Sequence, residues 1–167
     1  LSESKTGAII VIERDVNLQN YIDDGISVHA PVKCEVLNSI FYEGTPLHDG
    51  ALIIRGVMIE AAHVFVTPTT RALQGHYGAR HRAAIGMSEN SDALVIVVSE
   101  ETGTISIAEN GNLERPLTRD SLKKILRTKL LPEKPQKNNK TPKNNGENGE
   151  KKEHNGLFRK KKFTDKI

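Results

Sequence analysis

Short apolar runs alternate with turn residues along the first 131 positions, and this pattern predicts strands. Runs rich in β-branched residues and bounded by charged or turn residues are typical of strands with buried faces. Such segments occur at residues 7–12, 51–55, 58–66, 93–98 and 103–108. The Gly56-Val57 pair suits a tight turn, so we expect 51–55 and 58–66 to form a hairpin. Asn110-Gly111 predicts a further turn.

Apolar residues at helical spacing predict helices between these strands. One helix is expected from Pro31 to Phe41, with Pro31 in its first turn, and another over 118–131 with Thr118 as its N-cap. The Ala-rich residues after Arg80 predict a helix start, and residues 17–23 predict a short helix. Strands interleaved with helices indicate an α/β (α+β) fold with a mixed, partly antiparallel central sheet flanked by helices.

Composition divides the chain at position 131. Residues 132–167 carry 11 Lys and Arg against 5 Asp and Glu and few apolar residues, which predicts a disordered basic tail after a single domain at 1–131. We expect the tail to be either a solvated segment or, through the basic cluster at 159–162, a contact for an anionic membrane surface or an acidic partner. The domain itself carries 13 Lys and Arg against 16 Asp and Glu, which argues against nucleic acid as its partner.

The single cysteine and the short apolar runs argue against a disulfide framework, a thiolate metal site and a membrane span. Cys34 alone builds neither a disulfide framework nor a thiolate metal site within one chain, so a reducing, cytosolic setting is expected. No apolar run approaches the ~20 residues that a membrane span requires. Because the sequence begins with Leu1 and not Met, we expect an upstream segment to be missing.

Three polar segments interrupt the pattern where strands and helices meet. In the first, Asp49-Gly50 suits an ordinary turn, but His48 beside the carboxylate also makes a pair that binds a divalent metal or handles protons. In the second, Arg80, His81 and Arg82 open a helix. They either bind a phosphate or form a surface cluster paired with acidic residues, and cations at a helix N-terminus imply a compensating anion.

The third segment, 98–103, links two strands. Ser99 can donate a hydrogen bond to a phosphate, and a neighbouring carboxylate can hold a metal, although an ordinary polar connection also explains the segment. Together the three segments favour a metal-assisted anion site, without a Walker-type loop or a Ser-His-Asp order. Phosphoryl or nucleotidyl transfer fits such a site, because these reactions need mainly positioning and charge stabilisation.

The combination of segments resembles one family. Asp49-Gly50-Ala51, followed some 30 residues later by Arg80-His81-Arg82, is similar to the paired signatures of the diadenylate cyclase (DAC) domain family. The longer segments at 45–51, 80–86 and 98–103 resemble its membrane-anchored CdaA type. This resemblance implies a nucleotidyltransferase that condenses two ATP molecules into cyclic di-AMP and two pyrophosphates, with Mn²⁺ or Mg²⁺.

The resemblance also implies roles for individual residues. Asp49, Gly50 and Arg80 would be catalytic, and His48 and Asp49 would bind the metal. The implied substrate-binding residues are Gly50, Ala51, Phe65, Val66, Arg80, His81, Arg82, Ser99 and Glu101. Ala79 stands where the family usually has Thr, and residues 67–78 differ from the usual linker.

The product's symmetry predicts an assembly. Two equivalent 3′–5′ links require two ATP molecules to face each other, which a two-fold homodimer supplies. The resemblance further implies anchoring at the cytoplasmic face of the cell membrane. The alternative is a catalytically idle regulatory module that binds ATP or cyclic di-AMP.

Overall fold

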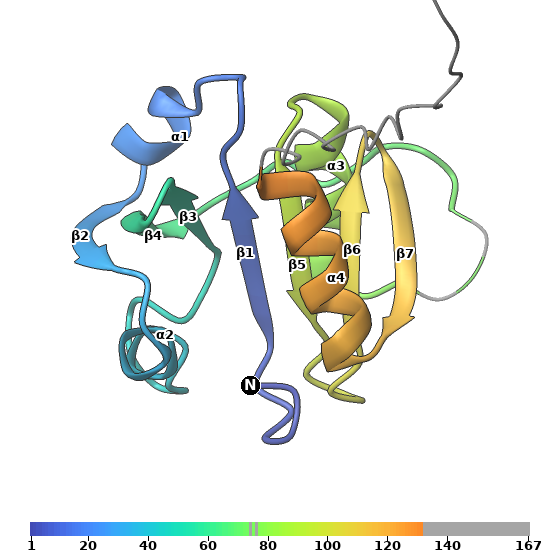
Figure 1. The fold of residues 1–167 in the computed structure, drawn as a ribbon, viewed down its shortest axis with the longest axis horizontal. Helices are drawn as coiled ribbons and strands as arrows, with labels where there is room; N and C mark the ends of the chain where they lie inside the picture. Colours follow the sequence, from blue (N-terminus) through green and yellow to red (C-terminus); the bar gives the residue numbers. More distant parts are fainter. Residues whose placement is uncertain (74, 76, 132–167) are drawn as a thin grey trace, which may run out of the picture. The chain divides into compact units, whose positions relative to one another are not determined.

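A mixed sheet of seven strands forms the centre of the computed structural model, which describes residues 1–73, 75 and 77–131 (Figure 1). The strands are β1 (Ala8–Ile12), β2 (Ile26–Pro31), β3 (Ala51–Arg55), β4 (Met58–Val64), β5 (Leu94–Val98), β6 (Ile105–Glu109) and β7 (Asn112–Leu117). They lie in the order β2-β4-β3-β1-β5-β6-β7. β1 pairs with β3 in parallel, and the remaining neighbours are antiparallel, which confirms the predicted sheet.

Helices cover both faces of this sheet. The described residues form four helices, which are α1 (Gln19–Asp23), α2 (Cys34–Ile40), α3 (Ala79–Glu89) and α4 (Arg119–Leu130). The buried residues of α3 and the partly buried residues of α1 pack on one face with Ile9 and Val11 of β1. The apolar residues of α2 and α4 pack on the other face with Ala8 and Ile10. In Figure 1, α4 accordingly lies in front of the strands and α3 behind them.

The strands with buried faces are those that the sequence predicted. The five expected segments correspond to β1, β3, β4, β5 and β6, and β3 and β4 form the expected hairpin around Gly56-Val57. The last helix begins after Thr118, whose hydroxyl oxygen accepts a hydrogen bond from the Ser121 amide at 3.2 Å, so the predicted N-cap is confirmed. The helices predicted after Arg80 and at 17–23 are confirmed as α3 and α1.

Two strands were not predicted, and one helix was placed too early. β2 and β7 are the edge strands of the sheet, and most of their residues are not buried, so neither shows a clear apolar run. Pro31 ends β2 instead of opening a helix, and α2 begins only at Cys34. Proline is tolerated in edge strands because one side of the strand makes no ladder hydrogen bonds.

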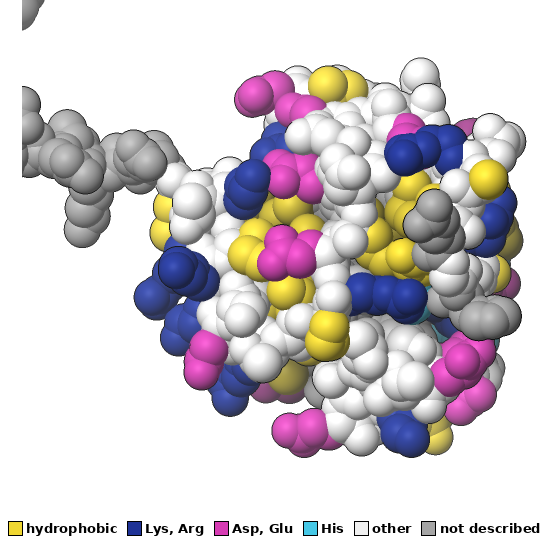
Figure 2. Space-filling view, turned by 90° about the vertical axis from the view of Figure 1, so that its right-hand side faces the viewer, with side chains coloured by type: hydrophobic (Ala, Val, Ile, Leu, Met, Phe, Trp, Pro, Cys, Tyr) yellow, Lys and Arg dark blue, Asp and Glu magenta, His cyan; other side chains and the backbone are white. Residues whose placement is uncertain are grey.

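Basic side chains mark the outer side of α4. Lys and Arg gather over this helix on the left of the face shown in Figure 2, and its outward residues Arg119, Lys123, Lys124 and Arg127 are exposed. None of the helices within the described ranges is long and apolar enough to span a membrane. The basic tail predicted at 132–167 lies outside the described residues.

Candidate active site

The turn that leads into β3 packs Gly50 against the end of β4. Gly50 has a φ of +90°, in the left-handed region that favours glycine. A Cβ at this position would lie 2.9 Å from the carbonyl oxygen of Val64, so a larger residue would displace the turn from the strand. The turn thus requires glycine for both conformation and space, and it leaves Asp49 exposed.

A bulge in β4 supports the same turn. The register between β3 and β4 shifts near His63, which has a φ of +56°. The Nδ1 atom of His63 donates a hydrogen bond to the carbonyl oxygen of Asp49 at 3.0 Å. The Phe65 ring packs edge-on against His63, with 4.8 Å between ring centroids. Bulges often redirect a side chain next to a functional site, and here the bulge holds the Asp49 backbone in place.

Arg80 lies in the first turn of α3, and three elements position it. Its guanidinium packs on the backbone of Gly7, where a Cβ would come within 2.7 Å of the Arg80 Cζ atom. The same guanidinium pairs with the carboxylate of Glu100, which follows β5. Sequence reasoning left two interpretations of this cluster open, and Glu100 is the compensating anion that a cation at a helix N-terminus requires.

Two pockets meet at Arg80. The Asp49 pocket, of about 240 Å³, is lined by Asp49, Gly50, Phe65, Val66 and Arg80, together with Ile9, Val64, Pro68, Ala79 and Ala83. The Ser99 pocket, of about 260 Å³, is lined by Arg80, His81, Ser99, Glu101 and Arg115, together with Gly78, Ala79, Glu100, Thr102 and Thr104. A larger depression of about 540 Å³ contains none of the site residues predicted from the sequence.

The fold therefore brings together most of the predicted site residues, although they come from distant parts of the chain. His48, Ala51 and Arg82 line neither pocket. Ala51 is fully buried in β3, and Arg82 donates a hydrogen bond to the carbonyl oxygen of Thr69 at 2.7 Å. That bond ties the segment before α3 to the helix.

His81 is a buried, neutral member of the cluster. It is 6% exposed, and its Nε2 atom lies 3.4 Å from the Ser106 hydroxyl. Burial lowers the pKa of His81, the nearby Arg115 cation lowers it further, and Glu101 opposes both effects. The imidazole is therefore neutral near pH 7, so the positive charge of the Ser99 pocket comes from Arg80 and Arg115.

His48 and Asp49 are the metal ligands that the sequence predicts, and a contact within the turn orients the His48 ring. The ring Nδ1 of His48 contacts the carbonyl oxygen of Thr45 and donates its proton there, so Nε2 is the ring nitrogen that would be able to bind a metal. No cluster of three or more His, Cys, Asp or Glu suited to a metal occurs among the described residues. Mg²⁺ in nucleotide sites typically takes one or two carboxylates and completes its shell with phosphates and water.

Sequence reasoning missed His63 and Arg115. An isolated histidine is more often structural than a ligand, so the sequence does not single out His63. Arg115 lies on the unpredicted edge strand β7, where no apolar alternation drew attention. The bulge in β4 brings His63 to the backbone of Asp49, and the position of β7 beside β6 brings Arg115 to the Ser99 pocket.

Residues 1–113 match the DAC family, described as "DisA bacterial checkpoint controller nucleotide-binding". The chain belongs to the DAC family. This match covers β1 to the start of β7 and therefore includes both pockets of the DAC domain, apart from Arg115.

Individual relatives agree with this assignment. The DAC domain is similar to the cyclic di-AMP synthase CdaA of Bacillus subtilis, with 44% identity over 128 residues, which are 75% of this chain and 46% of the relative. It is 50% identical over 113 residues to the cyclic di-AMP synthase CdaS of the same organism, covering 68% of this chain and 55% of CdaS. The chain thus spans about half the length of these relatives.

A solved structure shares the fold. DacA from Staphylococcus aureus superposes with a TM-score of 0.74 at 39% identity, over 76% of this chain and 85% of DacA. A structure described as a hypothetical membrane spanning protein from Bacillus cereus superposes with a TM-score of 0.64 at 45% identity, over 70% of this chain and 58% of that protein. The mixed sheet with flanking helices is therefore the DAC fold.

Proposed function

We propose that this chain is the catalytic domain of a diadenylate cyclase, which condenses two ATP molecules into cyclic di-AMP and two pyrophosphates. The observation that carries the proposal is the position of Arg80 between the Asp49 pocket and the Ser99 pocket. A nucleotide that spans both would place its nucleoside beside Phe65 and its triphosphate beside Ser99. Its α-phosphate would then lie at the guanidinium of Arg80, which suits a developing negative charge.

The chemistry needs an activated hydroxyl and a stabilised leaving group. In each half-reaction a ribose 3′-oxygen forms a bond to the α-phosphorus of the other ATP, and the bond from that phosphorus to the β-phosphate bridging oxygen breaks. Asp49, exposed at the rim of its pocket, accepts the hydroxyl proton or orients the hydroxyl. The leaving pyrophosphate carries away the negative charge that Arg80 has stabilised.

The remaining predicted residues hold the substrate. Phe65, which is 67% exposed, and Val66 offer an apolar surface for adenine, and stacking on an aromatic ring contributes about 1–3 kcal/mol per base in single-stranded systems. Gly50 and Ala51 bring the turn backbone close to the nucleotide. Ser99 donates to a phosphate oxygen. His81 and Arg82 support the phosphate-binding start of α3 from behind.

A divalent ion, Mn²⁺ or Mg²⁺, completes the proposed site. Bound by His48, Asp49 and phosphate oxygens, with Glu101 near the triphosphate, it would supply charge neutralisation and lower the pKa of the attacking hydroxyl. Imidazole together with a carboxylate is a donor set that Mn²⁺ accepts more readily than Mg²⁺.

The protein is further proposed to act as a homodimer at the membrane. A two-fold homodimer brings two ATP-loaded Asp49 pockets face to face, as the symmetry of the product requires. We further propose that the whole protein is anchored at the cytoplasmic face of the membrane. The similarity to CdaA and to a protein described as membrane spanning supports that location.

One incubation tests the proposed activity. The purified chain is mixed with ATP and either Mn²⁺ or Mg²⁺, and the products are identified by chromatography and mass spectrometry at several protein concentrations. Cyclic di-AMP and pyrophosphate in a 1:2 ratio are the expected products. ATP binding without any product at high protein concentration would instead support the idle regulatory module.

A further inference from the structure

The flat face of the Arg80 guanidinium lies on the backbone of Gly7, directly before β1. A Cβ built on Gly7 would lie 2.7 Å from Cζ, 2.9 Å from Nη1 and 3.0 Å from Nε of Arg80. Because these three distances are nearly equal, residue 7 lies over the plane of the guanidinium and not beside its edge. Real Cβ atoms essentially never come closer than 3.0 Å to another heavy atom, so glycine is what permits this contact.

The backbone on both sides of Gly7 is fixed. Before it, the Ser2 hydroxyl donates a hydrogen bond to the carbonyl oxygen of Gly103, in the connection between β5 and β6, at 2.6 Å. The Thr6 amide donates to the carbonyl oxygen of Leu1 at 2.9 Å. After Gly7 the chain continues into β1, which lies between β3 and β5. A side chain at position 7 would therefore displace the flexible end of the arginine more readily than the backbone.

The contact with Glu100 does not by itself fix the direction of the guanidinium. Arg80 contacts this carboxylate through Nη1, a single nitrogen, and the Glu100 side chain is 62% exposed. Further carboxylates lie on the two pockets that meet at Arg80, Glu101 on one and Asp49 on the other. One contact through one nitrogen permits rotation about that contact, whereas a flat surface under the group restricts its plane. The Gly7 backbone is such a surface.

We propose that Gly7 is a positioning residue for the phosphate site, because its bare backbone sets the plane of the Arg80 guanidinium where the two pockets meet. This inference rests on the proposed function, since it assigns the α-phosphate of ATP to Arg80. A methyl group at position 7 pushes the guanidinium away from β1 until ordinary van der Waals contact is reached. A displacement of about 1 Å in a group that positions a substrate can cost up to about a hundredfold in rate.

A double-mutant cycle tests whether Gly7 acts through Arg80. Gly7→Ala should weaken ATP binding, measured by calorimetry with Mg²⁺ present, about threefold to tenfold, which is part of the loss expected for Arg80→Ala. In the Arg80→Ala background the same substitution should change ATP binding less than about twofold, because no guanidinium remains to be displaced. Arg80→Lys is a second background, which keeps the charge and a measurable affinity but has no flat group to lie on residue 7. The same small change is expected there.

Gly56→Ala is the matched control for adding a methyl group to a glycine. Gly56 lies in the exposed turn between β3 and β4, has no described atom within 4 Å of the added group, and has a φ of +60°. A side chain at this φ is strained, so the unfolding temperature should fall. ATP binding should stay within about twofold, because Gly56 lines neither pocket of the site. Thermal unfolding of every variant thus separates a loss of stability from a loss of binding.

The outcomes separate the inference from the proposed function. Unchanged ATP binding by Gly7→Ala, or an equal loss in all three backgrounds, would overturn the inference. If Gly7→Ala alone is unfolded, a folded double variant with Arg80→Ala supports the contact. An unfolded double variant overturns it, because the methyl group then clashes with something other than Arg80. Binding needs no turnover, so coupling between positions 7 and 80 in a wild type that makes no cyclic di-AMP would reject the cyclase and retain the inference. Turnover without this coupling would do the reverse.

Discussion

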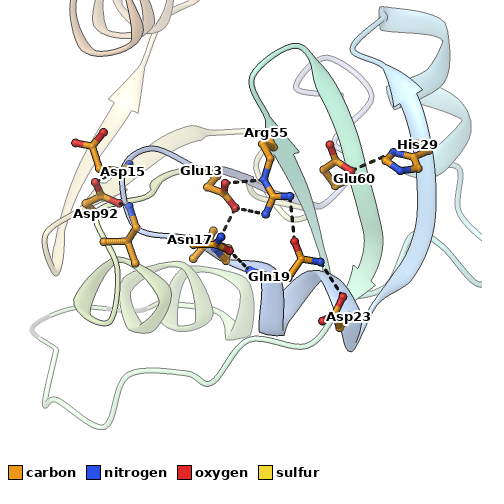
Figure 3. A network of polar contacts seen from close by, with 11 residues as sticks. Glu13, Asp15, Asn17, Gln19, Asp23, His29, Arg55, Glu60 and Asp92 are labelled. Atoms are coloured by element: carbon orange, nitrogen blue, oxygen red, sulfur yellow. Dashed lines mark hydrogen bonds and ion pairs between the residues drawn. The ribbon is translucent and has the colours of Figure 1, made fainter.

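Two arginine–glutamate pairs in this DAC domain have the same chemistry, but their glutamates have opposite surroundings. Arg55 binds Glu13 through two parallel hydrogen bonds of 2.6 and 2.9 Å and also donates to Gln19 at 3.1 Å (Figure 3). Glu13 accepts a further hydrogen bond from the Leu18 amide at 3.0 Å, and its side chain is only 9% exposed. Both ions therefore have most of their hydrogen-bonding capacity filled by protein.

The pair of Arg80 and Glu100 is built differently. A single nitrogen of Arg80 contacts Glu100, and the Glu100 side chain is 62% exposed. The remaining donors of Arg80 lie where two pockets meet. A single-contact pair whose carboxylate is exposed contributes little to stability, so a phosphate can replace Glu100 at low cost. The comparison shows that hydrogen-bond saturation distinguishes a structural ion pair from an exchangeable one.

The largest effect is expected at the Asp49 end of the site. Asp49→Asn removes the group that accepts the 3′-hydroxyl proton, so cyclic di-AMP formation should fall by about 10²–10⁴-fold. Because Asp49 is exposed, the unfolding temperature and the affinity for ATP should change little. Product formation and calorimetric ATP binding are measured on the same preparation. Undiminished turnover would remove Asp49 from the reaction.

The second-largest effect is expected for Arg80→Ala, on the KM for ATP. Loss of the guanidinium between the two pockets should raise the KM for ATP roughly tenfold to a hundredfold, and stability should change by less than about 1 kcal/mol. Steady-state kinetics measures the KM for ATP, and thermal unfolding measures the change in stability. A large loss of stability with an unchanged KM would show that Arg80 is a structural residue like Arg55.

Glu13→Gln should lower the stability and leave the KM unchanged, which is the reverse of the effect expected for Arg80→Ala. The variant keeps the shape of the side chain but loses the charge on one partner of a bidentate pair, which should lower the free energy of unfolding by about 1–3 kcal/mol and leave the KM unchanged. Urea unfolding monitored by circular dichroism measures the difference. If wild type and Glu13→Gln were equally stable at pH 7, the pair of Arg55 and Glu13 would be exchangeable, like the pair of Arg80 and Glu100.

The same variant has a defined pH dependence. The hydrogen bond from Arg55 lowers the pKa of Glu13 below its ordinary value of 4.5 in the folded protein. A carboxyl with a depressed folded pKa stabilises the fold above its unfolded pKa and loses that contribution as the pH falls through the folded pKa. The stability gap between wild type and Glu13→Gln should therefore be full at pH 6 and shrink below pH 4.5. Glu109, whose pKa is also lowered, is present in both proteins and cancels.

The smallest effect is expected for Glu100→Gln. Removing the anion that competes for Arg80 should tighten ATP binding about two- to fivefold and leave the unfolding temperature nearly unchanged. Calorimetry with ATP checks this expectation. The exposed Glu114→Gln on β7 is a charge-matched control, because it lines neither pocket. Weaker ATP binding by Glu100→Gln alone would show that Glu100 supports the nucleotide.

The sequence alone predicted the elements whose burial is dictated by their own residues. β1, β3, β4, β5 and β6 contain apolar runs because the sheet buries them, and α4 shows its apolar stripe directly. The motif residues Asp49 and Arg80 also stand out, since their neighbours are unusual for a plain turn or helix start. What the sequence could not signal were the edge strands β2 and β7, whose mostly unburied residues lack a period.

Tertiary structure alone decided how the site is assembled. Whether Glu100 lies against Arg80, whether Gly7 leaves space for that guanidinium, and whether Arg115 reaches the same pocket depend on strand order and register. Two bulges, one in β4 and one in β7, direct His63 and Arg115 to their positions. The local sequence pattern shows which face of a segment is buried. Contacts between distant segments depend instead on how the strands pair, since a register shift of one residue moves every side chain of a strand to the other face of the sheet.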